Sequence, residues 1–377
     1  MSAISPADPR PHRASCARRR GDGNALAARA TGIAAGFLLD RLVGDPRRFH
    51  PVAGFGRVAL AVESRLRRPG RTPNAQRAAG LLFTGVLVGG TAAAVTAVGQ
   101  RAGRNRTAAV VWDAAVVWSC LGGSSLLAVA RRQGDLLVRG DHAGSRELLP
   151  WLCGRDPSAL DPADLARAVV ESVAENTSDA AVATLFWAAV AGPPGAAVHR
   201  VANTLDAMVG HRSEEYRHFG TAAARLDDVL GFLPARVAGA LGVACAPTVG
   251  GSPAGALRAW ARDARAHPSP NAGVVEAVCA GALGVRLGGP TPYPYGVQDR
   301  AVLGDGRPVR AGDIRRAVLL HDRVQVVTAA LAVLGVVARR AGHHRPWDVR
   351  AKMTAPGRRP YDRRPAAHPR RHPGRPR

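Results

Sequence analysis

The chain has 377 residues, a 46% apolar composition and a formal net charge of +24 at pH 7. This length suits one or two domains with a sizeable core. The charge does not indicate a nucleic-acid partner, because residues 1–30 and 339–377 carry +4 and +11, which leaves +9 for the remainder. Basic segments beside apolar helices are typical of cytoplasmic loops that contact anionic lipid headgroups. Lys352 is the sole lysine, which excludes a P-loop, and the five scattered cysteines form no CxxC pair.

Long uncharged stretches dominate the interior of the sequence. Four of them carry no Asp, Glu, Lys or Arg: 80–99, 114–130, 180–198 and 237–257. A helix needs about 17–25 apolar residues to cross a bilayer core. We therefore predict an all-α, polytopic helical bundle that crosses the cell membrane several times. The alternative is a large soluble α-protein with buried helices. The expected divisions are a disordered basic leader (1–29), a membrane-embedded helical domain (30–340) that should carry the functional site, and a disordered Arg/Pro-rich tail (341–377).

The first polar cluster follows an apolar helix that we expect over 30–39. Asp-Pro and His-Pro steps disfavour continued helix, because the residue before proline avoids the α region. Asp40, Asp45, His50 and Arg57 are therefore expected on or beside an irregular loop. After it, the pattern predicts an amphipathic helix over 58–68, a linker over 69–77, and membrane spans over 80–99 and 107–130.

The stretch from Glu171 to Arg236 holds carboxylates next to apolar sequence, where they are costly unless paired, hydrated or bound to a cation. Asp161 and Pro162 predict a helix start. Glu171, Glu175 and Asp179 then follow at i, i+4 and i+8 on one stripe of that helix. A solvated helix face is the alternative to a binding site.

A turn at Gly192-Pro-Pro-Gly195 would fold this segment into a helical hairpin. It would bring Asp206 back towards Asp179, whereas a straight span would separate the two across the membrane.

The remaining pattern predicts a helix from Thr221, kinked at Pro234, and a Pro-rich loop over 267–273. It also predicts a loop over Gly288–Gly296 and a final helix over 314–340 that Asp313 caps. The sequence carries no β-sheet signal and no internal repeat.

Six motifs in this order are similar to one known family. The chain resembles adenosylcobinamide-phosphate synthases, which are membrane proteins of late cobalamin biosynthesis, over roughly residues 30–335. The Tyr293–Arg300 segment looks like a local variant. The motifs are Leu39–Pro46 with His50-Pro51, Glu171–Asp179, Asn203–Gly210, Tyr216–Gly220, Ala224–Asp228 and His267–Gly273.

The resemblance implies amide-bond formation between aminopropanol, usually as its O-phosphate, and a propionate carboxylate of adenosylcobyric acid. Activation by ATP and Mg²⁺ is expected, because amide formation from a free carboxylate is uphill in water. The 40–57 and 267–273 loops are expected to form walls of the corrinoid cleft, on the cytoplasmic side. Expected partners are the two substrates, the lipid bilayer and other late cobalamin enzymes.

The candidate residues fall into three sets. We expect catalytic roles for Glu171, Glu175, Asn176, Asp179, Asp206, Asp227 and Asp228. We expect substrate binding by Asp40, Asp45, His50, Arg57, Asn203, Thr204, Arg225, His267, Ser269 and Asn271. The expected Mg²⁺ ligands are Glu175, Asp179 and Asp206.

Two alternatives to the enzyme stay open from the sequence. A transporter would also use intramembrane carboxylates and a broken helix, but it predicts repeated halves. A non-catalytic membrane scaffold of the corrinoid pathway would not require the carboxylates to converge on one pocket.

Overall fold

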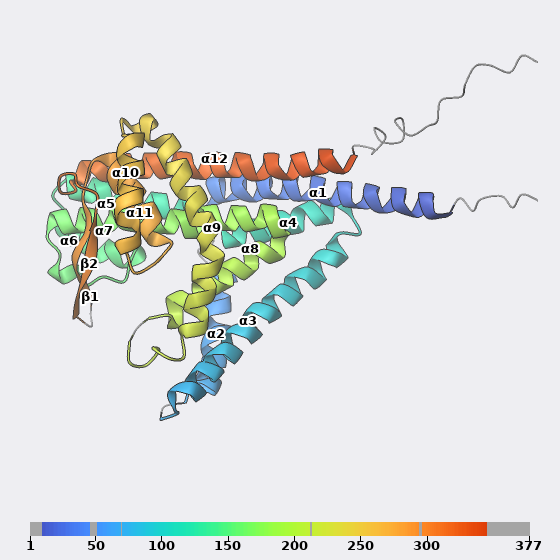
Figure 1. Cartoon of the computed structure of the whole chain (residues 1–377), viewed down its shortest axis with the longest axis horizontal. Coiled ribbons are helices and arrows are strands. Elements are labelled where there is room, and N and C mark those ends of the chain that lie inside the picture. The colour runs from blue at the N-terminus through green and yellow to red at the C-terminus, as the bar shows by residue number, and fades with distance from the viewer. Residues whose placement is uncertain (1–9, 46–50, 69, 212, 294–295, 345–377) are drawn as a thin grey trace, which may run out of the picture.

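Two long helices, α1 (Arg10–Val43) and α12 (Ala311–His344), run antiparallel side by side along the molecule (Figure 1). The computed structural model describes residues 10–45, 51–68, 70–211, 213–293 and 296–344. Most of these residues are helical, as predicted. Helix α1 begins inside the predicted leader, and α12 extends past the predicted start of the tail at residue 341. The proposed domain division itself stays a prediction.

Five helical stretches of the described chain are long and apolar enough to cross a membrane, which agrees with the predicted multi-pass membrane protein. They are Pro73–Ala102, Arg106–Val138, Pro162–Val209, Thr221–Val249 and Ala311–Ala341. The predicted span over 107–130 lies within the candidate span Arg106–Val138, although it is not one continuous helix. The chain forms α4 (Arg106–Cys120) and α5 (Gly123–Val138), and the backbone at Leu121 is extended between them.

The predicted helical hairpin is confirmed. Helix α7 (Pro162–Thr177) begins at Asp161, whose Oδ1 accepts a hydrogen bond from the Asp164 N–H at 2.7 Å. It continues through a π-helical turn (Ser178–Val182) into α8 (Ala183–Val209). At Gly192 the backbone leaves helical geometry (φ 74°, ψ −166°).

The reversal brings the two arms of the hairpin together. The Asn203 Nδ2 donates to Asp179 Oδ2 at 3.3 Å, although the two residues are 24 apart in sequence. A straight helix would separate them by about 36 Å.

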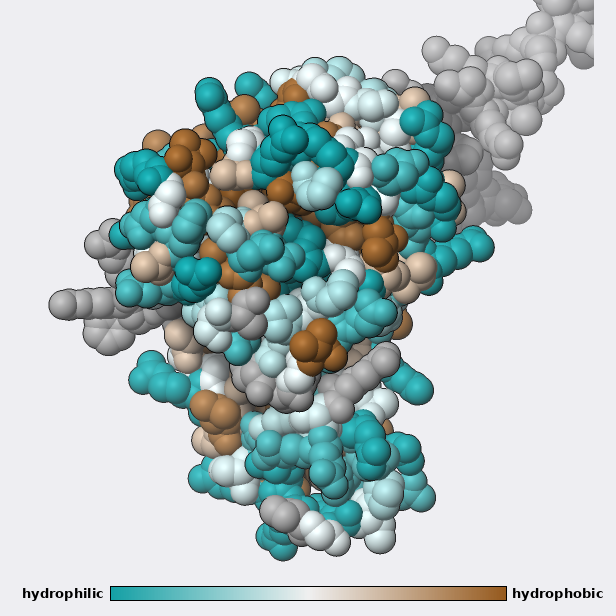
Figure 2. Space-filling view, turned by 90° about the vertical axis from the view of Figure 1, so that its left-hand side faces the viewer, coloured by the Kyte–Doolittle hydropathy of each residue, from teal (hydrophilic) through white to brown (hydrophobic). Residues whose placement is uncertain are grey.

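Shorter elements complete the bundle. Helices α2 (Pro51–Leu66), α3 (Pro73–Ala102) and α9 (Thr221–Cys245) lie together, and α3 leaves the bundle axis at an angle (Figure 1). Thr221 starts α9 as predicted, and Pro234 lies within that helix. Helices α6 (His142–Leu148), α10 (Pro253–Asp263) and α11 (Ala272–Leu283) gather at one end with α5 and α7. Hydrophilic residues cover much of that end, with scattered hydrophobic patches (Figure 2).

A β-hairpin lies at the same end of the molecule, and the predictions of a loop there and of no sheet are wrong. Strands β1 (Leu287–Tyr293) and β2 (Gly296–Leu303) pair antiparallel, with Gly289 opposite Arg300. The strands lack alternating apolar residues, so their sequence has no strand periodicity. The hairpin is held instead by polar contacts to α7, where Gly288 N donates to Glu171 Oε1 at 2.6 Å.

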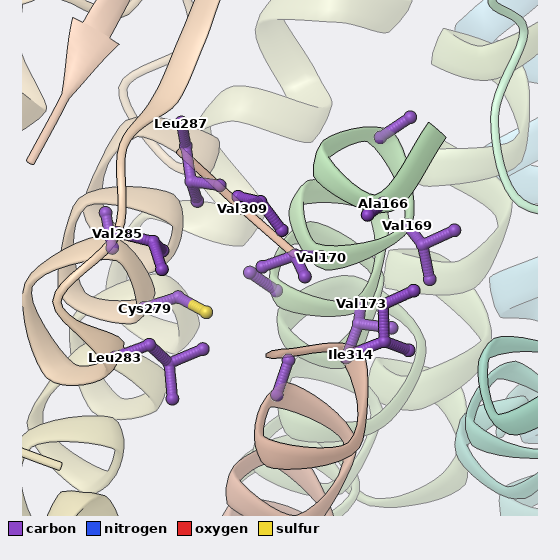
Figure 3. Packing of buried hydrophobic residues seen from close by; sticks show 14 of the residues in the cluster. Ala166, Val169, Val170, Val173, Cys279, Leu283, Val285, Leu287, Val309 and Ile314 are labelled. Atoms are coloured by element: carbon purple, nitrogen blue, oxygen red, sulfur yellow. The ribbon is translucent and has the colours of Figure 1, made fainter. Parts of the chain in front are cut away.

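An apolar core fixes α7 beneath this hairpin (Figure 3). Val169, Val170 and Val173 of α7 are fully buried and share one cluster with Cys279 of α11 and Ile314 of α12. Burial of each such side chain contributes about 1.5–3 kcal/mol. The core therefore holds the carboxylate-bearing helix in a single position.

Two further predictions about local structure require correction. Asp40 lies within α1, where Ser124 donates to its Oδ2 from N at 3.1 Å and from Oγ at 2.7 Å, and Arg57 lies within α2. Asp45 lies just after α1, and His50 lies outside the described residues. Because α12 starts at Ala311, Asp313 lies in its first turn, where it accepts the Arg310 N–H at 2.9 Å.

Candidate functional site

A polar cavity of about 960 Å³ lies between α7, α8, α9, the 266–272 segment and the β-hairpin. It is lined by residues from each of these elements, which lie far apart in the sequence. A cavity of this size, with convergent polar side chains, is the usual form of a ligand site. We describe its lining as two sets of charged residues.

Besides Asp299 on β2, five carboxylates line the cavity and form the acidic set: Glu175, Asp179, Asp206, Asp227 and Asp228. The first two come from α7 and its π-helical turn, the third from α8, and the last two from α9. The π-helical turn adds a residue to the helix at Asp179, a feature often found at functional sites. The hairpin and α9 therefore place five carboxylates around one space.

The Asn203 amide links members of the acidic set. It hydrogen-bonds Asp179 at 3.3 Å and also bonds Asp227. The Asp227 carboxylate interacts electrostatically with both Asp179 and Asp206. The expected convergence of Asp179, Asp206 and Asp227 is thus observed. Like charges this close favour a bound cation or proton.

The basic set consists of Arg155, before α7, and Arg300 on β2. Glu171 bonds both of them: Arg155 Nη2 donates to its Oε2, and Arg300 Nη1 lies 3.4 Å from the same oxygen. Arg300 Nη2 also donates to Glu276 Oε1 at 3.0 Å and contacts His267 Nε2. Glu171 and Glu276 do not line the cavity themselves; they hold the arginines that do.

Burial sets the charges around the basic set. Desolvation raises the pKa of Glu276 to about 8, with Arg300 opposing the shift. Desolvation also lowers the pKa of His267 to about 4, and Arg300 lowers it further. Both groups are therefore mostly neutral at pH 7, and the two guanidinium groups are balanced mainly by Glu171.

The structure places the predicted site residues in two groups. Nine of them line the cavity: Glu175, Asn176, Asp179, Asn203, Asp206, Asp227, Asp228, Ser269 and Asn271. Seven described ones do not: Asp40, Asp45, Arg57, Glu171, Thr204, Arg225 and His267.

Helix geometry explains why several predicted residues lie elsewhere. Arg225 is exposed on α9. Thr204 lines a different cavity, and its hydroxyl donates to Arg200 O at 2.7 Å. None of the described residues of 40–57 lines the polar cavity, and the expectation that this segment contacts the corrinoid stays a prediction.

Sequence reasoning missed Arg155, Arg300 and Glu276. The Cys153–Pro157 stretch contains Arg155 but has no helical or strand pattern that assigns it a role. Arg300 lies in the segment that departs from the family pattern. The tertiary fold alone brings these two residues together, because Glu171 bonds both of them.

The carboxylates fit Mg²⁺ only together with other ligands. Across the described ranges, no three His, Cys, Asp or Glu side chains are grouped so that they could hold a metal ion. The predicted set of Glu175, Asp179 and Asp206 is therefore not a ready-made three-ligand site. Asp227 Oδ1 is buried and has no hydrogen-bond partner among the described residues. Mg²⁺ often takes one or two carboxylates with phosphates and waters, which this arrangement can supply.

Comparisons with known proteins agree with the motif resemblance. The model of the family described as CobD/Cbib protein matches residues 33–321. The cobalamin biosynthesis protein CobD of Mycobacterium tuberculosis is 51% identical over 83% of this chain and 97% of the relative. The CobD of Geobacter metallireducens is 40% identical over 79% and 93%. The cobalamin biosynthesis protein CbiB of Salmonella typhimurium is 39% identical over 81% and 96%. No solved structure matches the chain. The chain belongs to the CobD/CbiB family.

Proposed function

We propose that the polar cavity is the active site of an adenosylcobinamide-phosphate synthase. As a member of the CobD/CbiB family, the chain acts in cobalamin biosynthesis, at the step that attaches aminopropanol. The substrates are adenosylcobyric acid and aminopropanol or its O-phosphate. The observation that carries the assignment to this cavity is its lining, in which six carboxylates and two arginines from distant segments surround one space.

The chemistry requires activation of a carboxylate, since direct amide formation is uphill in water. We infer that ATP supplies it. A corrin carboxylate oxygen attacks the γ-phosphorus, ADP leaves, and an acyl phosphate forms. The amine nitrogen then attacks the acyl carbon and inorganic phosphate leaves. Mg²⁺, when bound, would neutralise phosphate charge between the acidic set and the nucleotide.

The acidic set suits the proton transfer in the second step. The attacking amine must lose a proton, and a carboxylate within hydrogen-bond reach can accept it as a general base. Glu175 and Asp179 are the strongest candidates, because both line the cavity and lie at the end of α7, which the core holds, and in the π-helical turn that follows it. Asn203 would keep Asp179 in position through its hydrogen bond.

The cavity is proposed to open to the cytoplasm, where both substrates are made. The polar end of the molecule in Figure 2, which carries the β-hairpin, would then face that compartment. The broad rim suits a large amphipathic corrinoid, whose polar edges can bond the 266–272 segment and the β-hairpin.

The test is turnover by the purified protein with adenosylcobyric acid, aminopropanol phosphate, ATP and Mg²⁺. Glu175→Gln and Asp179→Asn are expected to lower kcat at least about 100-fold, because a general base typically contributes 10²–10⁴-fold. Glu147→Gln, at an exposed position on α6, is the matched control and should keep wild-type turnover. Folded wild-type protein that forms no corrinoid amide would contradict the proposal, and unchanged turnover in both variants would remove these residues from the site.

A further inference from the structure

Arg155 is buried and Arg300 is largely buried, yet both line the cavity. The exposed fractions of the Arg155 and Arg300 side chains are 4% and 11%. In the sequence, Arg155 precedes α7 and Arg300 follows α11. Glu171 contacts both of them. Its Oε2 accepts Arg155 Nη2 and lies 3.4 Å from Arg300 Nη1, while its Oε1 accepts the Gly288 N–H. Glu171 therefore fixes both guanidinium groups and the start of the β-hairpin.

The basic set keeps unused capacity to bind an anion. Arg155 Nη1 is buried and has no hydrogen-bond acceptor among the residues that the structure describes. A buried N–H without an acceptor costs about 1–3 kcal/mol, so such a group usually has a partner in the working protein. Glu276, which bonds Arg300 at 3.0 Å, has its pKa raised to about 8 by desolvation. The basic set thus keeps a net positive charge at neutral pH.

We propose that Arg155 and Arg300 bind the phosphate group of a reactant, and that Glu171 and Glu276 are positioning residues that hold the two guanidinium groups. The inference rests on the proposed function of the cavity. Guanidinium groups bind phosphate through paired N–H donors, a geometry that lysine cannot reproduce. The phosphate belongs either to the amino alcohol or to the nucleotide.

The β-hairpin gives Arg300 its place in this arrangement. Strand β2 is mostly exposed, so it has little apolar burial to hold it. Arg167 bonds the backbone oxygens of Gly288 and Pro290 and thereby anchors β1 to α7. Arg167 Nη1 also lies 4.0 Å from Glu171 Oε1, so Arg167 belongs to the contacts that place Arg300.

The experiment compares Arg155→Lys and Arg300→Lys with the wild type. Initial rates are measured against aminopropanol phosphate, free aminopropanol and ATP, each varied in turn. Both lysine variants keep the charge that Glu171 needs but lose the paired donors. We expect the KM of one phosphate-bearing reactant to rise roughly tenfold or more, because the loss of one charge-assisted hydrogen bond weakens binding by about this factor. A rise for aminopropanol phosphate but not aminopropanol assigns the amine donor, and a rise for ATP alone assigns the nucleotide.

Arg286→Gln is the matched control, because Arg286 is exposed, directly precedes β1 and does not line the cavity. It should leave every KM near the wild-type value. Glu171→Gln should raise the same KM as the lysine variants. Glu171→Asp keeps the carboxylate, so its KM should lie between those of Glu171→Gln and the wild type. If Glu171 had a purely structural role, its variants would instead lower kcat for all reactants alike. If Arg300→Lys does not fold, Arg155→Lys gives the same readout.

Two results separate this inference from the proposed function. Unchanged KM values in an active Arg155→Lys enzyme, or an equal rise caused by Arg286→Gln, would overturn it while leaving the proposed function intact. A wild-type protein without turnover would contradict the proposed function itself.

Discussion

Glu276 illustrates how burial sets the charge of one side chain beside the cavity. Its side chain is fully buried, and its Oε2 has no hydrogen-bond partner among the described residues. Arg300 faces it at 3.0 Å and His267 Nε2 lies 3.7 Å from its Oε1. Arg155, Glu171 and Glu175 also act on it electrostatically. Desolvation outweighs the two arginines and raises its pKa to about 8.

Replacing Glu276 by Gln should change how stability depends on pH. An unfolded Glu titrates near pH 4.3, so between about pH 4 and pH 8 the folded wild type holds a proton that the unfolded chain has lost. Wild-type stability therefore falls as pH rises through this window. Glu276→Gln lacks this loss and should be more stable than the wild type at pH 8–9, by on the order of a few kcal/mol, with little difference near pH 5.

Thermal unfolding in detergent between pH 5 and 9 measures this difference. The His267 pKa, lowered to about 4, contributes equally to both proteins and cancels when they are subtracted. Glu214→Gln, at an exposed position, should show no such trend. A difference between Glu276→Gln and wild type that is constant with pH would show that Glu276 is ionised in the folded protein.

At the scale of elements, the α7–α8 hairpin depends on one residue at its turn. Gly192 has φ 74° and ψ −166°, a region that residues with a side chain rarely adopt. A Cβ there would also lie 2.7 Å from Arg29 Nη2. The turn sets the contact between Asn203 and Asp179, so it links backbone geometry to the acidic set.

Gly192→Ala should therefore destabilise the protein by about 1–3 kcal/mol and lower turnover. Gly90→Ala is the matched control, because Gly90 lies inside α3 with no atom within 4 Å of an added Cβ. The control should be neutral or stabilising by up to about 1 kcal/mol, as alanine favours helix. Unfolding in detergent, together with product formation, measures both effects. Equal stability of the two alanine variants would contradict the role of Gly192 as the turn.

The same elements show what local sequence can and cannot predict. The cap at Asp161 and the turn near Gly192 were predictable, because capping and glycine chemistry act within a few residues. The convergence of Asp179 with Asp206 followed from that turn. The β-hairpin and the pairing of Arg300 with Glu276 were not predictable from local pattern. They are stabilised by buried polar contacts between segments far apart in the chain, and such contacts produce no periodic pattern of apolar residues in the sequence.

At the scale of the whole molecule, burial is uneven between the helices. In the most apolar part of 162–209, 61% of the residues are buried, whereas only 17% are buried in the most apolar part of α3. The inner side of α3 packs through Phe83, whose ring lies 5.1 Å from that of Phe219. Its outer side exposes Leu82 and Val86, and α3 diverges from the bundle (Figure 1). In a membrane, lipid chains cover such an exposed apolar surface, so α3 forms part of the lipid boundary. The well-buried α7–α8 hairpin carries the site.

Val86→Arg tests this arrangement, because Val86 lies near the middle of α3 and is 53% exposed. An arginine at the centre of a spanning helix costs about 2.5–3.5 kcal/mol on insertion scales, so the yield of membrane-integrated, folded protein should fall. Gln100→Arg, near the end of the same helix, should be tolerated, because a long side chain there can reach the headgroups. The fraction retained in membranes after alkaline extraction measures integration for both variants. Equal retention of Val86→Arg and the wild type would mean that this face of α3 lies in water, and α3 could not then form the lipid boundary.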